Sequence, residues 1–135
     1  MTCETIKMEI PASPDYVSIL RLTISGIANK IGFSMDEIED MKVAVSEACT
    51  NAIKHSEDNK VDIIFNLLED GMQIEIKDNG KGYDVGSIEI PDLSNPKESG
   101  LGIFIIQSLM DDVSIESKDD QGTTIKMTKY LGVDI

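Results

Sequence analysis

The ten residues Ser46-Glu-Ala-Cys-Thr-Asn-Ala-Ile-Lys-His55 organise the rest of this chain. Within them Glu47, Asn51 and His55 recur every four residues, a spacing that aligns side chains along one face of a helix. Small side chains that would leave room for a ligand lie beside this column, at Ala44, Ala48 and Ala52. Taken alone, a carboxylate, an amide and an imidazole on one helix face indicate a solvated surface. The remaining sequence has to decide between a surface and a site.

Length and composition predict one soluble domain. A chain of 135 residues with 41% hydrophobic residues can bury a sizeable core without disulfides. No apolar run approaches the ~20 residues that a membrane span needs, and the first residues, Met-Thr-Cys-Glu-Thr, do not resemble a signal peptide. Two cysteines, Cys3 and Cys49, are too few for a disulfide framework, so we expect a reducing cytoplasm and no membrane association.

The charge balance is strongly acidic. Twenty-five acidic residues against twelve basic ones give a net charge of −13 at pH 7. Such a field repels nucleic acid, so no direct nucleic-acid binding is expected, and it favours basic protein partners. Solubility alone would also explain the charge, and both interpretations remain open.

The first half of the chain predicts a strand and two helices. Residues 5–10 alternate as a strand, and Ser13 followed by proline indicates the start of a helix that runs to about Lys30 and ends at Gly32. The motif Ser34-Met-Asp-Glu37 is a capping box that opens a second helix, the one that carries the polar column. Residues 56–60 are polar and predict a loop.

The second half predicts a hairpin, a long irregular segment, a helix and a second pair of strands. Strands are expected over 61–68 and 72–77, joined by a turn at 69–71, and the pattern of the second one places Asp78 toward the core. Residues 83–99 lack periodicity and predict a lid or a disordered loop. A helix over 103–110 begins at Gly100-Leu-Gly102, and strands follow over 113–118 and 123–130.

These elements give the order β-α-α-β-β-lid-α-β-β. Because the strands mostly meet as hairpins, the expected fold class is an α/β (α+β) two-layer sandwich, in which three helices cover one face of a largely antiparallel mixed sheet. We expect residues 1–135 to form a single domain.

Four separated motifs occur in order on these elements. Glu47 and Asn51 lie on a helix, Asp78-x-Gly80-x-Gly82 follows a strand, Gly100-x-Gly102 opens a helix, and Gly122-Thr123 opens a strand. Each motif alone is weak, but together they resemble the nucleotide-binding boxes of the GHKL ATPases, the superfamily of gyrase, Hsp90, histidine kinases and MutL. The resemblance implies a Bergerat-type ATP-binding fold. A P-loop enzyme is excluded, because no Gly-x-x-x-x-Gly-Lys-Ser/Thr segment is present.

A closer resemblance covers nearly the whole chain. It is to the anti-sigma factor serine-protein kinases of Gram-positive bacteria, the sigma-B type above all. Four segments carry this similarity: Pro14 with Arg21-Leu-Thr, the segment from Ile38 to Ala52, the Gly100-Leu-Gly102 box, and Met127-Thr-Lys-Tyr-Leu131. That family holds a sigma factor or, alternatively, an anti-anti-sigma protein that it phosphorylates on serine. The resemblance implies a cytoplasmic homodimer.

The resemblance implies ATP and Mg²⁺ as cofactors and assigns residues to the nucleotide. Asp78 would accept the exocyclic amine of adenine, and Thr123 would reach the same ring through its hydroxyl or a water. Gly80 and Gly82 would shape the pocket for base and ribose. Backbone N–H groups at a helix start would bind the phosphates, from Gly100, Leu101 and Gly102.

Asn51 would give its side-chain oxygen to Mg²⁺, and Glu47 would be the general base that polarises the acceptor serine. Arg21 is expected to contact a partner, with an ordinary surface arginine as the alternative. For four other residues a purely structural role explains the sequence at least as well as a role in phosphate contact or catalysis. These are Lys81 and Lys97 as surface lysines, Tyr83 as lid packing, and His55 as a hydrogen-bonding residue at the pocket rim.

The predicted function is an ATP-dependent protein-serine kinase that sequesters a sigma factor and phosphorylates its anti-anti-sigma antagonist. The alternative is a nucleotide-gated binding protein with little phosphoryl transfer. A catalytic fragment of a histidine kinase is a third possibility, but no histidine precedes His55 to act as an upstream phosphoacceptor.

Overall fold

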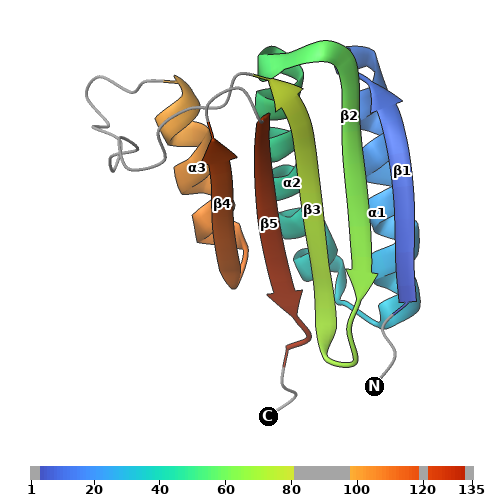
Figure 1. Cartoon of the computed structure of the whole chain (residues 1–135). Helices are drawn as coiled ribbons and strands as arrows, with labels where there is room; N and C mark the ends of the chain where they lie inside the picture. The colour runs from blue at the N-terminus through green and yellow to red at the C-terminus, as the bar shows by residue number, and fades with distance from the viewer. Residues whose placement is uncertain (1–3, 81–97, 119–121, 133–135) are drawn as a thin grey trace.

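The computed structural model describes residues 4–80, 98–118 and 122–132. Within these residues, three α-helices and five strands follow the predicted order (Figure 1). Their bounds are β1 Glu4–Pro11, α1 Val17–Ile31, α2 Met35–His55, β2 Ser56–Leu67, β3 Gly71–Gly80, α3 Glu98–Leu109, β4 Asp112–Lys118 and β5 Gly122–Tyr130, with a short 3₁₀ turn, Pro14–Tyr16, before α1.

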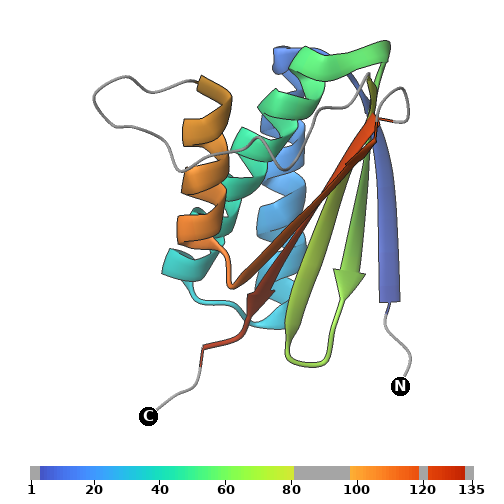
Figure 2. The ribbon, with the colours of Figure 1, turned by 60° about the vertical axis from the view of Figure 1, so that its left-hand side comes forward.

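The strands form one antiparallel sheet in the order β1-β2-β3-β5-β4. All three helices lie on one face of it, so the molecule has two layers (Figure 2). The end of β3, the start of β5 and the junction of α2 with β2 gather at one end of the sheet, at the top of Figure 1. This confirms the predicted two-layer fold and brings together segments that are far apart in sequence.

The caps predicted in the first half of the chain are present. The Ser13 side chain accepts a hydrogen bond from the Asp15 N–H at 3.4 Å, and Gly32 ends α1 in the left-handed conformation with φ of 110°. Ser34 and Glu37 form the capping box in both directions, at 3.2 and 2.8 Å. These caps fix where the chain turns between the first strand and the two long helices.

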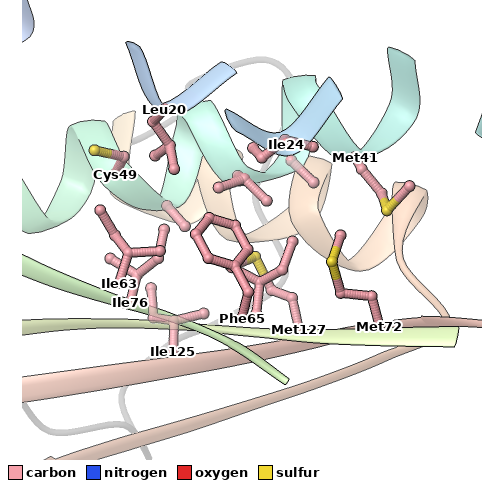
Figure 3. Packing of buried hydrophobic residues seen from close by; sticks show 14 of the residues in the cluster. Leu20, Ile24, Met41, Cys49, Ile63, Phe65, Met72, Ile76, Ile125 and Met127 are labelled. Atoms are coloured by element: carbon pink, nitrogen blue, oxygen red, sulfur yellow. The ribbon is translucent and has the colours of Figure 1, made fainter. Parts of the chain in front are cut away.

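The core lies between the helices and the inner face of the sheet. Phe65 of β2 points toward α1 and α2 and is fully buried with Leu20 and Ile24 (Figure 3). Ala44, Ala48 and Ala52 of α2 also belong to this buried cluster. The space that these small side chains leave is therefore filled by core packing, and not by a ligand as the sequence suggested.

Three predicted boundaries are wrong. Residues 56–60 are not a loop, because α2 passes directly into β2 at Ser56, and this residue pairs with Gly80 across a register shift. The polar side chains of this segment are satisfied locally: Asp58 accepts hydrogen bonds from Asn79 at 2.7 Å and from Ser56 at 3.1 Å. A polar sequence can thus form a strand end when its neighbours supply partners.

The other two errors concern the ends of β3 and the start of α3. β3 continues through Gly80, and α3 begins at Glu98 instead of Ile103. Gly80 is the last residue of β3, and Gly100 and Gly102 lie within α3, so these glycines do not mark the boundaries that the sequence predicts. No helix in the described part of the chain is long and apolar enough to span a membrane.

Candidate nucleotide-binding site

Asp78 is a buried carboxylate at the end of β3. Its side chain is 4% exposed and follows Met72, Ile74 and Ile76 on the inner face of the sheet, which confirms the predicted orientation. One carboxylate oxygen accepts a hydrogen bond from the Gly80 N–H at 2.9 Å. Burial raises the pKa of Asp78, and the Gly80 hydrogen bond and the charge of His55 oppose this only in part. An acid held in this way has unused capacity to accept a donor.

Two glycines allow other segments to approach Asp78 closely. A Cβ atom on Gly80 would overlap the carbonyl oxygen of His55, the last residue of α2. A Cβ on Gly122 would overlap the carbonyl oxygen of Asp78 itself, and Gly122 has φ of 79°, which favours glycine. Gly80 therefore has a packing role against α2, in addition to the ligand-facing role that the resemblance implied.

The polar column of α2 borders the core. Glu47 and Asn51 are half-buried, and His55 is exposed at the end of the helix. His55 is close enough to Asp78 for its charge to affect the pKa of that carboxyl group. The column thus leads along α2 toward the buried acid, with His55 nearest to it.

The start of α3 lies beside the other end of this column. A Cβ atom on Gly102 would be 3.4 Å from a carboxylate oxygen of Glu47, an ordinary van der Waals distance, so the two residues are neighbours. Gly100 lies in the first turn of α3, where backbone N–H groups have no acceptor within the helix. Leu101 and Gly102 are half-buried and lie further into the helix than predicted.

Thr123 opens β5 opposite Asp78 and is 3% exposed. Its hydroxyl is 2.9 Å from the hydroxyl of Ser117 on β4. Sequence reasoning passed over Ser117, although it shares the inward parity of Val113 and Ile115, and this alternation was a signal that could have identified it.

The remaining predicted residues divide between described and undescribed segments. Arg21 is exposed on α1. Several predicted residues lie outside the described ones: Lys81, Gly82, Tyr83, Lys97 and all but the last two residues of the predicted lid. Among those described, no cluster of three or more His, Cys, Asp or Glu side chains could hold a metal ion.

The chemistry of the residues fits a magnesium-bound adenine nucleotide. A buried acceptor, Asp78, suits an amine donor of a base, and a half-buried amide oxygen at Asn51 suits a cation that keeps most of its ligands from phosphate and water. The base and cation groups lie on β3 and α2, whose ends meet at Gly80 and His55.

Comparison with known proteins identifies the family. The histidine kinase-like ATPase domain family matches residues 10–129. Serine-protein kinase RsbW of Bacillus cereus strain Q1 is 45% identical over 95% of this chain and 86% of its own length. The RsbW protein of Bacillus thuringiensis subsp. konkukian gives the same values.

Solved structures agree in fold. A crystal structure of the RsbU and RsbW domains of Rv1364c from Mycobacterium tuberculosis has a TM-score of 0.73 at 18% identity, with 97% of this chain covered. The match spans about a third of that chain (33%). The histidine kinase domain of the Erythrobacter litoralis EL346 blue-light activated kinase has a TM-score of 0.56 at 17% identity and covers 90% of this chain and 62% of that one. The chain belongs to the histidine kinase-like ATPase family and, within it, to the RsbW serine-protein kinases.

Proposed function

We propose that this serine-protein kinase uses ATP and Mg²⁺, sequesters a sigma-B-like sigma factor, and phosphorylates the anti-anti-sigma antagonist of that factor. The observation that carries the nucleotide part is Asp78. Asp78 is 4% exposed at the end of an apolar strand face, and burying a carboxylate there costs free energy. A hydrogen-bond donor has to offset that cost. The exocyclic amine of adenine is such a donor, and guanine presents an acceptor at the same position.

Each predicted residue has a role in this proposal. Asp78 would accept the adenine amine, and Thr123 would contact the ring directly or through a water. Gly80 and Gly82 are assigned to the base and ribose by the resemblance alone. Backbone N–H groups of Gly100, Leu101 and Gly102 would bind the phosphates, and Asn51 would give its side-chain oxygen to the cation. ATP would supply the phosphoryl group as the substrate, and Mg²⁺ held by Asn51 would neutralise its charge. Glu47 would accept the proton of the acceptor serine hydroxyl as that oxygen attacks the γ-phosphorus, and the bond from this phosphorus to the bridging oxygen would break to release ADP.

The geometry along α2 supports this division of roles. His55 lies next to Gly80 and Asp78, whereas Glu47 lies next to Gly102 of α3. With a rise of about 1.5 Å per residue, Glu47 and His55 are roughly 12 Å apart along the helix. One end of the column is thus near the proposed base site and the other near the proposed phosphate site.

The regulatory part of the proposal rests on resemblance, charge and exposure. The net charge of −13 suits a surface that binds a basic protein, and Arg21 is exposed on α1, where a partner can reach it. We further propose a cytoplasmic homodimer in which residues 1–135 form one kinase domain and residues 83–99 act as its lid. Sedimentation equilibrium would distinguish the dimer from a monomer.

A phosphoryl-transfer assay tests the enzymatic proposal. The chain is mixed with labelled Mg·ATP and candidate anti-anti-sigma proteins, and the phosphoserine formed on the acceptor is measured. The affinity of the chain for the nucleotide is measured separately. We expect Glu47→Ala to bind the nucleotide and lose about 100-fold or more in transfer rate. Asn51→Ala should also weaken Mg·ATP binding. Glu69→Ala removes an exposed carboxylate from the turn between β2 and β3 and is the matched control.

The outcomes separate the alternatives. Transfer by Glu47→Ala at the wild-type rate would remove Glu47 from the role of base. Nucleotide-dependent partner binding without any transfer would favour the alternative of a nucleotide-gated binding protein.

Partner contact through Arg21 has its own test. Arg21→Ala should reduce capture of the sigma factor in a pull-down, whereas Lys30→Ala, which removes another exposed cation of α1, should not. Equal capture by both variants would make Arg21 an ordinary surface residue.

A further inference from the structure

The inner face of the sheet changes from apolar to polar in a single step. Ile125 of β5 has Ile76 of β3 and Ile115 of β4 as its cross-strand partners. Two residues further toward the sheet end, Thr123 has Asp78 and Ser117 as its partners. Three neighbouring strands therefore present a carboxylate and two hydroxyls side by side, directly beyond a row of isoleucines.

Within this polar row the two hydroxyls are coupled. Thr123 is 3% exposed, and its oxygen lies 2.9 Å from that of half-buried Ser117, with either atom able to donate. A hydroxyl has one proton to donate and two lone pairs. A partner on one side limits the rotation of the Thr123 hydroxyl, and what Thr123 offers on its other side then depends on whether that partner donates or accepts.

We propose that Ser117 is a positioning residue for base recognition: it donates to the Thr123 oxygen, so that Thr123 keeps its own proton for the ring nitrogen next to the amine of adenine. The inference rests on the proposed adenine site. An ionised Asp78 carboxylate can accept hydrogen bonds but cannot donate them, so it is matched to the amine of adenine. The neighbouring ring nitrogen needs a donor, which Thr123 supplies directly or through one water. Acceptor and donor in this order match a 6-aminopurine and mismatch a 6-oxopurine.

The test compares two nucleotides in the intact protein. Wild-type chain and variants are titrated calorimetrically with Mg·ATP and with the 1-deaza analogue, in which the ring nitrogen is replaced by CH. In the wild-type chain the analogue should bind more weakly than ATP. Ser117→Ala should lower ATP affinity about threefold to tenfold, the usual range for one net hydrogen bond, and should leave analogue affinity nearly unchanged. The preference for ATP over the analogue then shrinks.

Three variants serve as controls. Ser117→Thr retains the hydroxyl and should restore the preference. Ser114→Ala removes an exposed hydroxyl from the opposite face of β4 and should change neither affinity. Adding Ser117→Ala to Thr123→Val should have no further effect, because the hydroxyl that Ser117 positions is already absent.

The outcomes distinguish this inference from the proposed function. A wild-type chain that fails to bind ATP would contradict the nucleotide site itself. If the wild type binds ATP but Ser117→Ala keeps the same preference for ATP over the analogue, the role of Ser117 alone is overturned. An equal loss of affinity for both nucleotides would overturn it too, because it indicates a structural effect. Thermal unfolding of each variant verifies folding, and Ser117→Cys, nearly the same size with a weaker donor, replaces Ser117→Ala if alanine prevents folding.

Discussion

At the scale of single residues, Asp78 should make stability and the proposed ATP binding respond to pH in opposite directions. Its pKa is raised by burial, so the folded apoprotein holds this proton to higher pH than the unfolded chain does. As pH rises from the unfolded-state pKa through the folded-state pKa, the buried charge develops and this residue's contribution to stability falls. The ionised carboxylate is the stronger acceptor for an amine donor, so the proposed ATP binding should weaken as pH falls through the same raised pKa.

We therefore expect the free energy of unfolding and the ATP affinity of the wild type, each compared with Asp78→Asn, to change with pH in opposite directions. The free energy of unfolding of the wild-type apoprotein, minus that of the variant, should increase as pH falls from 7 toward 4, because protonation relieves the buried charge. ATP affinity of the wild type should decrease over the same range, while the variant binds at least about tenfold more weakly and without this step. Urea denaturation and calorimetry at several pH values measure both quantities.

Asp62→Asn is the matched control, because its side chain alternates with those of Val61 and Ile63 and points to the other face of the sheet. If Asp78→Asn bound ATP as tightly as the wild type, the assignment of Asp78 to the base would be wrong.

At the scale of elements, the start of α2 is held by a reciprocal cap that also reaches the end of the described chain. Besides its bond to Ser34, the Glu37 carboxylate accepts a hydrogen bond from the Gly132 N–H at 3.0 Å. The pKa of Glu37 is lowered, first by its bond from the Ser34 backbone. Its contribution to stability is present above the unfolded-state pKa and is lost as pH falls through the lowered folded-state value.

Ser34→Ala removes one half of this cap and should destabilise the protein by about 1 kcal/mol at neutral pH, the usual effect at a helix N-cap. Urea denaturation followed by circular dichroism measures the loss. Ser108→Ala is the control: that hydroxyl donates to the Phe104 carbonyl within α3 at 2.8 Å, so its removal should change stability by less than about 0.5 kcal/mol. Equal effects of the two substitutions would contradict the importance of the cap.

At the scale of the whole molecule, both layers depend on one apolar core. Phe65 is fully buried among residues of α1, α2 and the sheet (Figure 3). Phe65→Ala should cost about 3–5 kcal/mol, a large part of the ~5–15 kcal/mol that stabilises a typical domain. Phe104→Ala removes a phenylalanine that is 43% exposed on α3 and should cost much less. Thermal and chemical denaturation compare the two variants, and similar losses would show that the core lies elsewhere.

The sequence by itself determined the order of elements, the helix caps, the two-layer arrangement and the inward orientation of Asp78. These features depend on local physics: a period of two or 3.6 residues, a serine followed by a glutamate three residues later, and a glycine after a helix. The same local signals misled at 56–60 and at the start of α3, where polar residues and glycines lie inside regular structure.

Only the tertiary structure decided what lies across from each residue. Gly80 faces the His55 carbonyl, Gly102 faces Glu47, and Ser117 faces Thr123, and in each pair the partners come from different elements. Such contacts depend on strand register and on the packing of a helix against its neighbour, and no single segment encodes either. For this reason the sequence motifs indicate Asp78 and Thr123 but not Ser117, whose proposed role exists only through the strand beside it.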